Sequence, residues 1–96
     1  MHISIRRYRE VVSVAEVCRK IGDTFVPVLR RSPGFIAYYA IDAGDGVMAT
    51  ISVFSTEDMA LESNEKAAQW LKANVADLQP VPAEITAGAV KLVITA

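Results

Sequence analysis

The sequence predicts an α+β fold in which two helices pack on one face of a four-stranded antiparallel sheet. Three observations predict it: two long segments with apolar residues at steps of three and four, apolar segments of strand length around them, and an Asp-Gly turn between two of the strands. The chain has 96 residues, of which 52% are hydrophobic and 22% charged. This length suits one domain, so we expect residues 1–96 to form a single unit.

The first predicted element is a strand near the N-terminus. Ile3 and Ile5 alternate with Ser4 and Arg6. Such alternation is typical of a strand that has one face at least partly in contact with water. We therefore expect about six residues of strand here.

A long helix is predicted to follow the first strand. Ser13 and Glu16 have the spacing of a capping box, which marks the start of a helix. Gly22 and Pro27 strain the helix, because glycine costs about 1 kcal/mol relative to alanine and proline removes an amide hydrogen bond. We expect the helix either to bend at Asp23 or to restart near Pro27. The apolar stripe predicts a helix over 14–31 (Val14, Val17, Ile21, Phe25, Val28 and Leu29).

A β-hairpin is predicted from two apolar segments. The segments cover 35–41 and 47–54, and the Asp-Gly step within 42–46 is a strong turn signal. Neither segment alternates cleanly between apolar and polar residues. Both faces of the hairpin should therefore be covered, one by the helices and the other by something else.

The second helix is predicted from residue 55 or 56 to about residue 78. Two acidic residues in its first turn complement the positive end of the helix dipole. Asn64 projects into the middle of the apolar stripe, and Trp70 lies on its shoulder. The stripe itself consists of Ala60, Ala67, Leu71 and Leu78.

The last strand completes the predicted topology. Residues 79–82, two of which are proline, should stop the helix and form a stiff connector. Residues 83–86 and 90–95 then predict strand, with a bulge or corner at Gly88. The order strand-helix-strand-strand-helix-strand is that of a ferredoxin-like βαββαβ fold. Because its second sheet face would be bare and apolar, we expect a homodimer through that face.

The composition excludes several kinds of site. With only His2 and Cys18, the chain has too few ligands for a structural zinc site, an iron–sulfur centre or an internal disulfide. Neither a G-x-G-x-x-G sequence nor a phosphate-binding P-loop sequence occurs. We therefore expect no metal and no cofactor.

Charge and hydropathy give expectations about partners and location. Residues 1–31 contain seven basic and three acidic side chains, and the rest of the chain is acidic. Most of these basic residues would lie on the wet side or at the carboxyl end of the first helix, so we expect no nucleic-acid partner. No apolar stretch has the length of a membrane helix or the form of a signal peptide, so we expect no membrane and a cytoplasmic location.

Together, several segments resemble the antibiotic biosynthesis monooxygenase-like (ABM-like) branch of the dimeric α+β barrels. The resemblance covers essentially the whole chain and implies a homodimer with a pocket between helices and sheet in each subunit. That family includes cofactor-free oxygenases of quinol-type aromatic compounds, haem-degrading enzymes and many proteins without a known role. The segments are Arg31-Ser32-Pro33-Gly34-Phe35, the 42–46 turn, Ser63-Asn64, Trp70 and the 82–88 connector.

The resemblance implies site residues. Asn64 and Trp70 match the catalytic residue types of the oxygenases, which also use tyrosine and arginine side chains in the pocket. Strand neighbours point to opposite faces, so one member of each pair should face the pocket. A buried amide can equally form a structural hydrogen bond, and a tryptophan can simply be core. The candidate pocket residues are Tyr38, Tyr39, Arg6 and Arg7.

Two functions remain open at this point. The first is a cofactor-independent monooxygenase acting on a small aromatic, quinol-type compound; the second is a non-catalytic homodimeric module that binds a small ligand or a partner. Haem degradation is disfavoured, because haem-degrading members have a ligating histidine where this chain has Pro80 and an asparagine near the place of Arg6 and Arg7. Whether the protein is an enzyme is left open.

Overall fold

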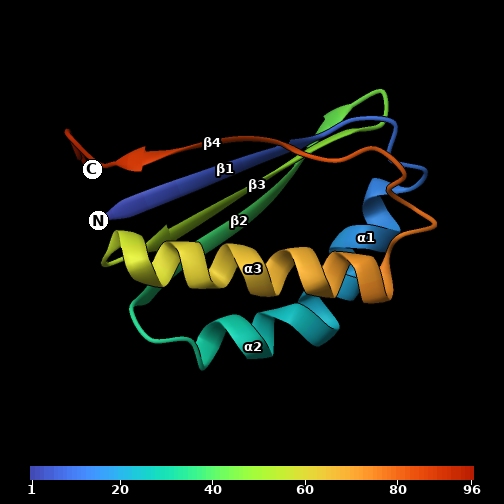
Figure 1. Cartoon of the computed structure of the whole chain (residues 1–96). Coiled ribbons are helices and arrows are strands. Elements are labelled where there is room, and N and C mark those ends of the chain that lie inside the picture. The colour runs from blue at the N-terminus through green and yellow to red at the C-terminus, as the bar shows by residue number, and fades with distance from the viewer.

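The computed structural model describes residues 1–96 and confirms the predicted fold. All strand pairs are antiparallel, in the order β2-β3-β1-β4. The helices lie together on one side of this sheet (Figure 1). The strands are β1 (His2–Tyr8), β2 (Phe35–Gly44), β3 (Val47–Phe54) and β4 (Glu84–Ala89). The helical elements are α1 (Val14–Lys20), the π-helical turn η1 (Ile21–Phe25), α2 (Val26–Arg30) and α3 (Glu57–Asn74).

The first helical segment accommodates Pro27 through a π-helical turn that precedes it. The segment is helical to Arg30, close to the predicted end, but η1 replaces the expected bend or restart. The amide of Val26 donates to the carbonyl of Ile21, five residues back. Pro27 has no amide hydrogen to donate, and the π-helical register allows the chain to widen before it instead of breaking.

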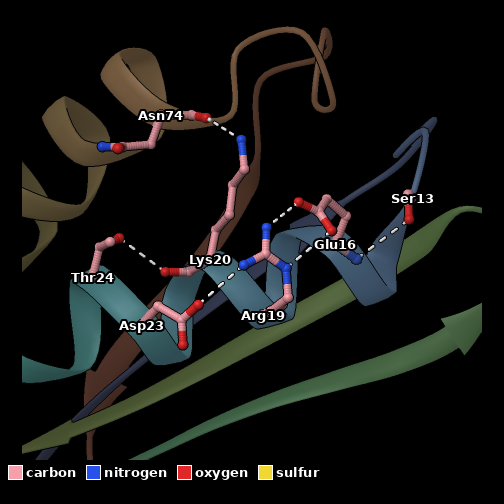
Figure 2. Close-up of polar contacts among 7 residues, drawn as sticks. All are labelled: Ser13, Glu16, Arg19, Lys20, Asp23, Thr24 and Asn74. Carbon is pink, nitrogen blue, oxygen red and sulfur yellow. Dashed lines mark hydrogen bonds and ion pairs between the residues drawn. The ribbon is translucent and has the colours of Figure 1, made fainter.

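The start of α1 follows the predicted cap only in part. The Ser13 hydroxyl accepts a hydrogen bond from the amide of Glu16 at 3.3 Å, as expected. The reciprocal half of the capping box is wrong, because the carboxylate of Glu16 binds Arg19 instead. Arg19 also pairs with Asp23 at 3.1 Å, so its guanidinium bridges α1 and η1 (Figure 2).

The hairpin is longer than predicted. β2 continues three residues past the expected end, and a register shift falls between Asp42 and Gly44. Asp45 and Gly46 both have positive φ, at 53° and 74°, which is the backbone that a two-residue hairpin turn requires. The carboxylate of Asp42 accepts the amide of Gly44 at 2.9 Å and fixes the bend.

Helix α3 begins at the predicted cap, Thr56, and ends four residues early, at Asn74. Val75 leaves the helical conformation, and its side chain is fully buried in the core. The carbonyl of Asn74, which has no acceptor role left within the helix, receives Nζ of Lys20 at 3.2 Å (Figure 2). The helix therefore ends where tertiary packing of Val75 outweighs further helical hydrogen bonds.

The C-terminal prediction is wrong in two respects. β4 runs without interruption through Gly88, which pairs with Ile3, so no bulge or corner occurs there. Residues 90–96 are not strand. The amide of Val90 donates to the carbonyl of Met1 at 2.9 Å.

β1 presents its polar residues to the helices. Ser4, Arg6 and Tyr8 are buried on the helix side of the sheet, whereas Ile5 is exposed on the other side. The predicted alternation is therefore present, but the partly polar set is the buried one. The core next to this set consists mainly of Val17, Ile21, Phe25, Leu29, Met48 and Phe54.

Replacement of a core leucine tests this packing. Leu29→Ala should lower the free energy of unfolding by about 2–5 kcal/mol, because Leu29 is only 1% exposed and its removal leaves a cavity. Leu61→Ala is the matched control, since Leu61 is 52% exposed and should change stability by less than about 0.5 kcal/mol. Urea denaturation measures both; equal losses would contradict the placement of Leu29 in the core.

Candidate functional site

A small cavity lies beneath α3, between this helix, the sheet and the first helical segment. Its free central space is about 20 Å³, enough for one water molecule. Six of its fourteen lining residues are apolar side chains of η1, α2 and α3. Its polar lining consists of Arg6, Tyr8, Tyr38, Thr50, Ser52, Ser63 and Asn64.

Arg6 is a buried cation without a counter-ion. Its side chain is 8% exposed, and Nη2 donates to the backbone carbonyl of Asn64 at 2.8 Å. Its Nε is buried and has no hydrogen-bond partner. No carboxylate lines the cavity, and Arg6 forms no salt bridge. Buried charges are normally paired with an opposite charge, and Arg6 has no such partner within the chain.

Asn64 connects α3 to β1 through both its backbone and its side chain. The side-chain amide donates from Nδ2 to the hydroxyl of Ser4 at 3.2 Å, and the backbone carbonyl accepts from Arg6. Asn64 therefore bonds to a side chain on the neighbouring strand, at the wall of the cavity. Its Nδ2 carries a second hydrogen, which can donate to a ligand in the cavity.

Trp70 forms an aromatic part of the wall. Its indole donates from Nε1 to the hydroxyl of Thr24 at 2.8 Å, and its ring centroid lies 5.4 Å from that of Phe25. Thr24 in turn donates to the carbonyl of Lys20, a contact visible in Figure 2. The π-helical turn thus fixes the orientation of Trp70 relative to the cavity.

Tyr38 and Tyr39 separate as alternation requires. Tyr38 lines the cavity and meets Phe25 edge-on, with ring centroids 6.1 Å apart. Tyr39 is 59% exposed on the opposite face of the sheet. Arg7 likewise is exposed beside Arg6 and does not line the cavity. Of the four candidate pocket residues, only Tyr38 and Arg6 therefore reach it.

The environment of Tyr38 keeps its hydroxyl protonated. Burial raises the pKa of Tyr38 well above its usual value, and a hydrogen bond with Thr50 opposes this effect only in part. The phenol can therefore donate a hydrogen bond to a ligand but does not act as a base near neutral pH.

Several polar lining residues were not foreseen from the sequence. Thr50 pairs with Arg6 in the sheet, and Ser52 pairs with Ser4. The available signal was their two-residue spacing on one apolar strand, which places both on the same face.

No group of three or more His, Cys, Asp or Glu side chains in the chain could hold a metal ion, and no helix has the length and hydropathy to span a membrane.

Alkaline titration tests the environment of Tyr38. The unfolded chain loses the phenol proton near pH 10, whereas the folded chain retains it, so the stabilising contribution is complete below about pH 10 and is lost as the pH rises further. The free energy of unfolding should thus fall more steeply between about pH 10 and 11 for the wild type than for Tyr38→Phe. Denaturant curves at each pH measure the difference, and parallel pH dependences would disprove it.

Comparisons with known proteins give similarity in structure only. The sequence matches no protein-family model and no curated protein. A monooxygenase from the gene ActVA-Orf6 of Streptomyces coelicolor, solved with nanaomycin D, superimposes with a TM-score of 0.76 at 12% identity, over 99% of this chain and 91% of that one. SnoaB, a cofactor-independent oxygenase from Streptomyces nogalater, gives 0.71 at 16% identity, over 97% and 95%.

Similarity also extends to proteins without a known function. NE2512 of Nitrosomonas europaea, described as a protein of unknown function, has a TM-score of 0.71 at 20% identity, over 98% of this chain and 95% of that one. Identities this low establish the fold and leave the activity open. With its ferredoxin-like sheet and these neighbours, the chain has the antibiotic biosynthesis monooxygenase-like fold.

Proposed function

We propose that this protein is a cofactor-independent monooxygenase that acts on a small aromatic, quinol-type compound in the cavity beneath α3. The observation that carries the proposal is the buried, unpaired guanidinium of Arg6 beside Asn64. Two structural neighbours, the ActVA-Orf6 protein and SnoaB, are described as a monooxygenase and a cofactor-independent oxygenase, which supports the same class of reaction.

The chemistry assigned to the site is stabilisation of a substrate anion. A phenol or quinol that loses its proton becomes electron-rich enough to transfer an electron to oxygen. Arg6 would lower the pKa of the bound hydroxyl through its fixed positive charge, and Asn64 and Tyr38 would orient the ring oxygen. No histidine or carboxylate lines the cavity, so the proton leaves to solvent. One oxygen atom becomes a ring carbonyl, and the other leaves as water with the hydrogens of the substrate.

Binding of an aromatic ring requires α3 to move. The central space holds only one water molecule, whereas ligand pockets typically span about 300–1,000 Å³. The fully buried residues of α3 are only Ala60 and Ser63, both small. A shift of the helix away from the sheet would also uncover part of Ala67, Trp70 and Leu71, which pack against the core, and Trp70 and Tyr38 would then form the walls around the ring.

The small central space also favours the second candidate function. A cavity that stays closed would suit a non-catalytic homodimeric module that binds a small ligand or a partner. The two candidates differ in one respect, because only the oxygenase consumes oxygen when a quinol is present.

We further propose that the active species is a homodimer formed through the open face of the sheet. Ile5, Tyr39 and Ile41 are exposed there, next to an apolar C-terminal segment that includes Leu92 and Ile94. Large exposed apolar patches of this kind mark interaction sites, and a second copy of the chain is the simplest complement.

A cytoplasmic location and a single functional domain over residues 1–96 complete the proposal. Cys18 is a free thiol, which suits a reducing compartment. The thiol packs 3.9 Å from the sulfur of Met48, and burial raises its pKa, so it has no assigned role in catalysis.

Oxygen consumption with a panel of quinols and naphthols tests the oxygenase. Asn64→Ala should lower the rate by about 10²–10³-fold, because an oriented donor to the developing anion is lost. The matched control is Asn74→Ala on the same helix, whose side chain bonds only to the carbonyl of Trp70 and should leave the rate unchanged. Equal rates for wild type and Asn64→Ala would remove Asn64 from the mechanism, and no uptake with any compound would favour the binding module.

Sedimentation at micromolar concentration tests the dimer. The wild type should have twice the 10.4 kDa mass of the chain. Ile41→Lys should shift it to the monomer, because a buried ammonium in the interface lacks a partner. Leu61→Lys is the control, since Leu61 has nearly the same exposure, 52% against 49%, but lies on α3 away from the sheet face. A wild-type mass of a single chain would contradict the proposal.

A further inference from the structure

The cavity beneath α3 combines a single positive charge with very little space. Arg6 is the only charged residue among its fourteen lining residues. The free central space of about 20 Å³ is enough for a particle of the size of one water molecule. An aromatic ring requires α3 to move, whereas a single atom does not. With α3 in its present position, the cavity therefore suits a monatomic ligand.

The charge of Arg6 is not balanced by any group of the chain. The residue is 8% exposed and forms no salt bridge. Its bond to the carbonyl of Asn64 uses one of the five N–H donors of a guanidinium, which satisfies a donor but does not neutralise the charge. A buried charge without an opposite charge destabilises the fold, so an anion in the cavity would stabilise it.

The other polar groups of the cavity can donate hydrogen bonds to such an anion. Burial raises the pKa of Tyr38, so its phenol stays protonated and can donate. Asn64 has a second amide hydrogen, and the hydroxyl groups of Thr50 and Ser63 can rotate toward a ligand. A halide ion accepts hydrogen bonds from any direction and returns none. It therefore matches a cavity that offers several donors around one cation.

We propose that this cavity binds one halide ion, of the size of chloride, beside Arg6 and with Tyr38 and Asn64 as hydrogen-bond donors. The inference goes beyond the proposed function and does not depend on it, because binding requires only the cation, the donors and the small space. If the protein is also an oxygenase, the halide occupies the place of the substrate anion. Chloride should then raise KM for the quinol and leave kcat unchanged.

Thermal unfolding of the full chain tests the binding. The melting temperature is measured in sodium chloride and in sodium gluconate at equal ionic strength, since gluconate is a monovalent anion that is too large for the cavity. At a chloride concentration tenfold above its dissociation constant, the melting temperature should rise by about 6–11 °C. Equal melting temperatures in the two salts would overturn the inference whatever any variant does.

The fluorescence of Trp70 tests where the halide binds. Trp70 is the only tryptophan of the chain and lines the cavity. Bromide, a heavy-atom quencher close to chloride in size, should quench its emission over a saturable range, and chloride, which does not quench, should restore the emission by competition. Quenching that rises linearly with bromide and is not reversed by chloride would mean collision from solvent only, and would overturn the site.

Three variants assign the halide to Arg6. Arg6→Met should abolish both the stabilisation by chloride and the saturable quenching by bromide. Asn64→Asp should abolish them as well, because a carboxylate of nearly the same shape as the amide then supplies the missing negative charge at the wall of the cavity. Arg7→Met is the matched control, since Arg7 is the exposed neighbour of Arg6 on β1 and does not line the cavity.

The variants can also contradict the assignment. Halide binding that persists in Arg6→Met, or that is lost in Arg7→Met, would overturn the role of Arg6. If Arg6→Met does not fold, Asn64→Asp provides the test, because halide binding that persists in the folded Asn64→Asp protein would overturn it equally.

The outcomes separate this inference from the proposed function. Halide binding without oxygen consumption for any quinol would overturn the oxygenase and leave the halide site in place. Oxygen consumption together with equal melting temperatures in chloride and gluconate would overturn the halide site alone.

Discussion

The rest of the structure depends on which face of β1 lies against the helices, and the mark of that face is the hydrogen bond between Arg6 and the carbonyl of Asn64 in α3. It joins residues 58 positions apart and holds a charged side chain beneath the longest helix. Because Arg6 faces the helices, Ser4 and Tyr8 face them too, since the strand alternates. β1 thus places polar side chains on the buried face of the sheet, and two of them, Arg6 and Tyr8, line the cavity.

The orientation of β1 also determines which side chains lie on the open face of the sheet. With the polar set turned inward, Ile3 and Ile5 lie on the open face, where Tyr39 and Ile41 of β2 extend the apolar area. Apolar packing inside the chain is displaced from β1 toward η1, α2 and β3, where Phe25, Leu29 and Phe54 are buried. A polar cavity on one side of the sheet and an apolar surface on the other are therefore two consequences of one register.

The element order was predictable because periodicity and turn residues are local. The helix over 14–31, the hairpin and the start of the second helix depend on neighbours within a few positions. The inward face of β1 was not predictable, because alternation states that Ser4 and Ile5 point apart and not which of them is buried. Which face of β1 is buried is determined by partners that are distant in sequence. Asn64, for example, donates a hydrogen bond to Ser4. The end of α3 depends likewise on the packing of Val75 in the core.

The chemistry available to the site follows from what surrounds Arg6. Its cavity offers a fixed cation, an amide and a protonated phenol, but no histidine or carboxylate to remove a proton. Such a site cannot act as a general base, and its strongest effect is to favour the anionic form of whatever binds. In the proposed oxygenase reaction the reactive electrons would then come from the ligand, so the site would favour ligands that are acidic and electron-rich.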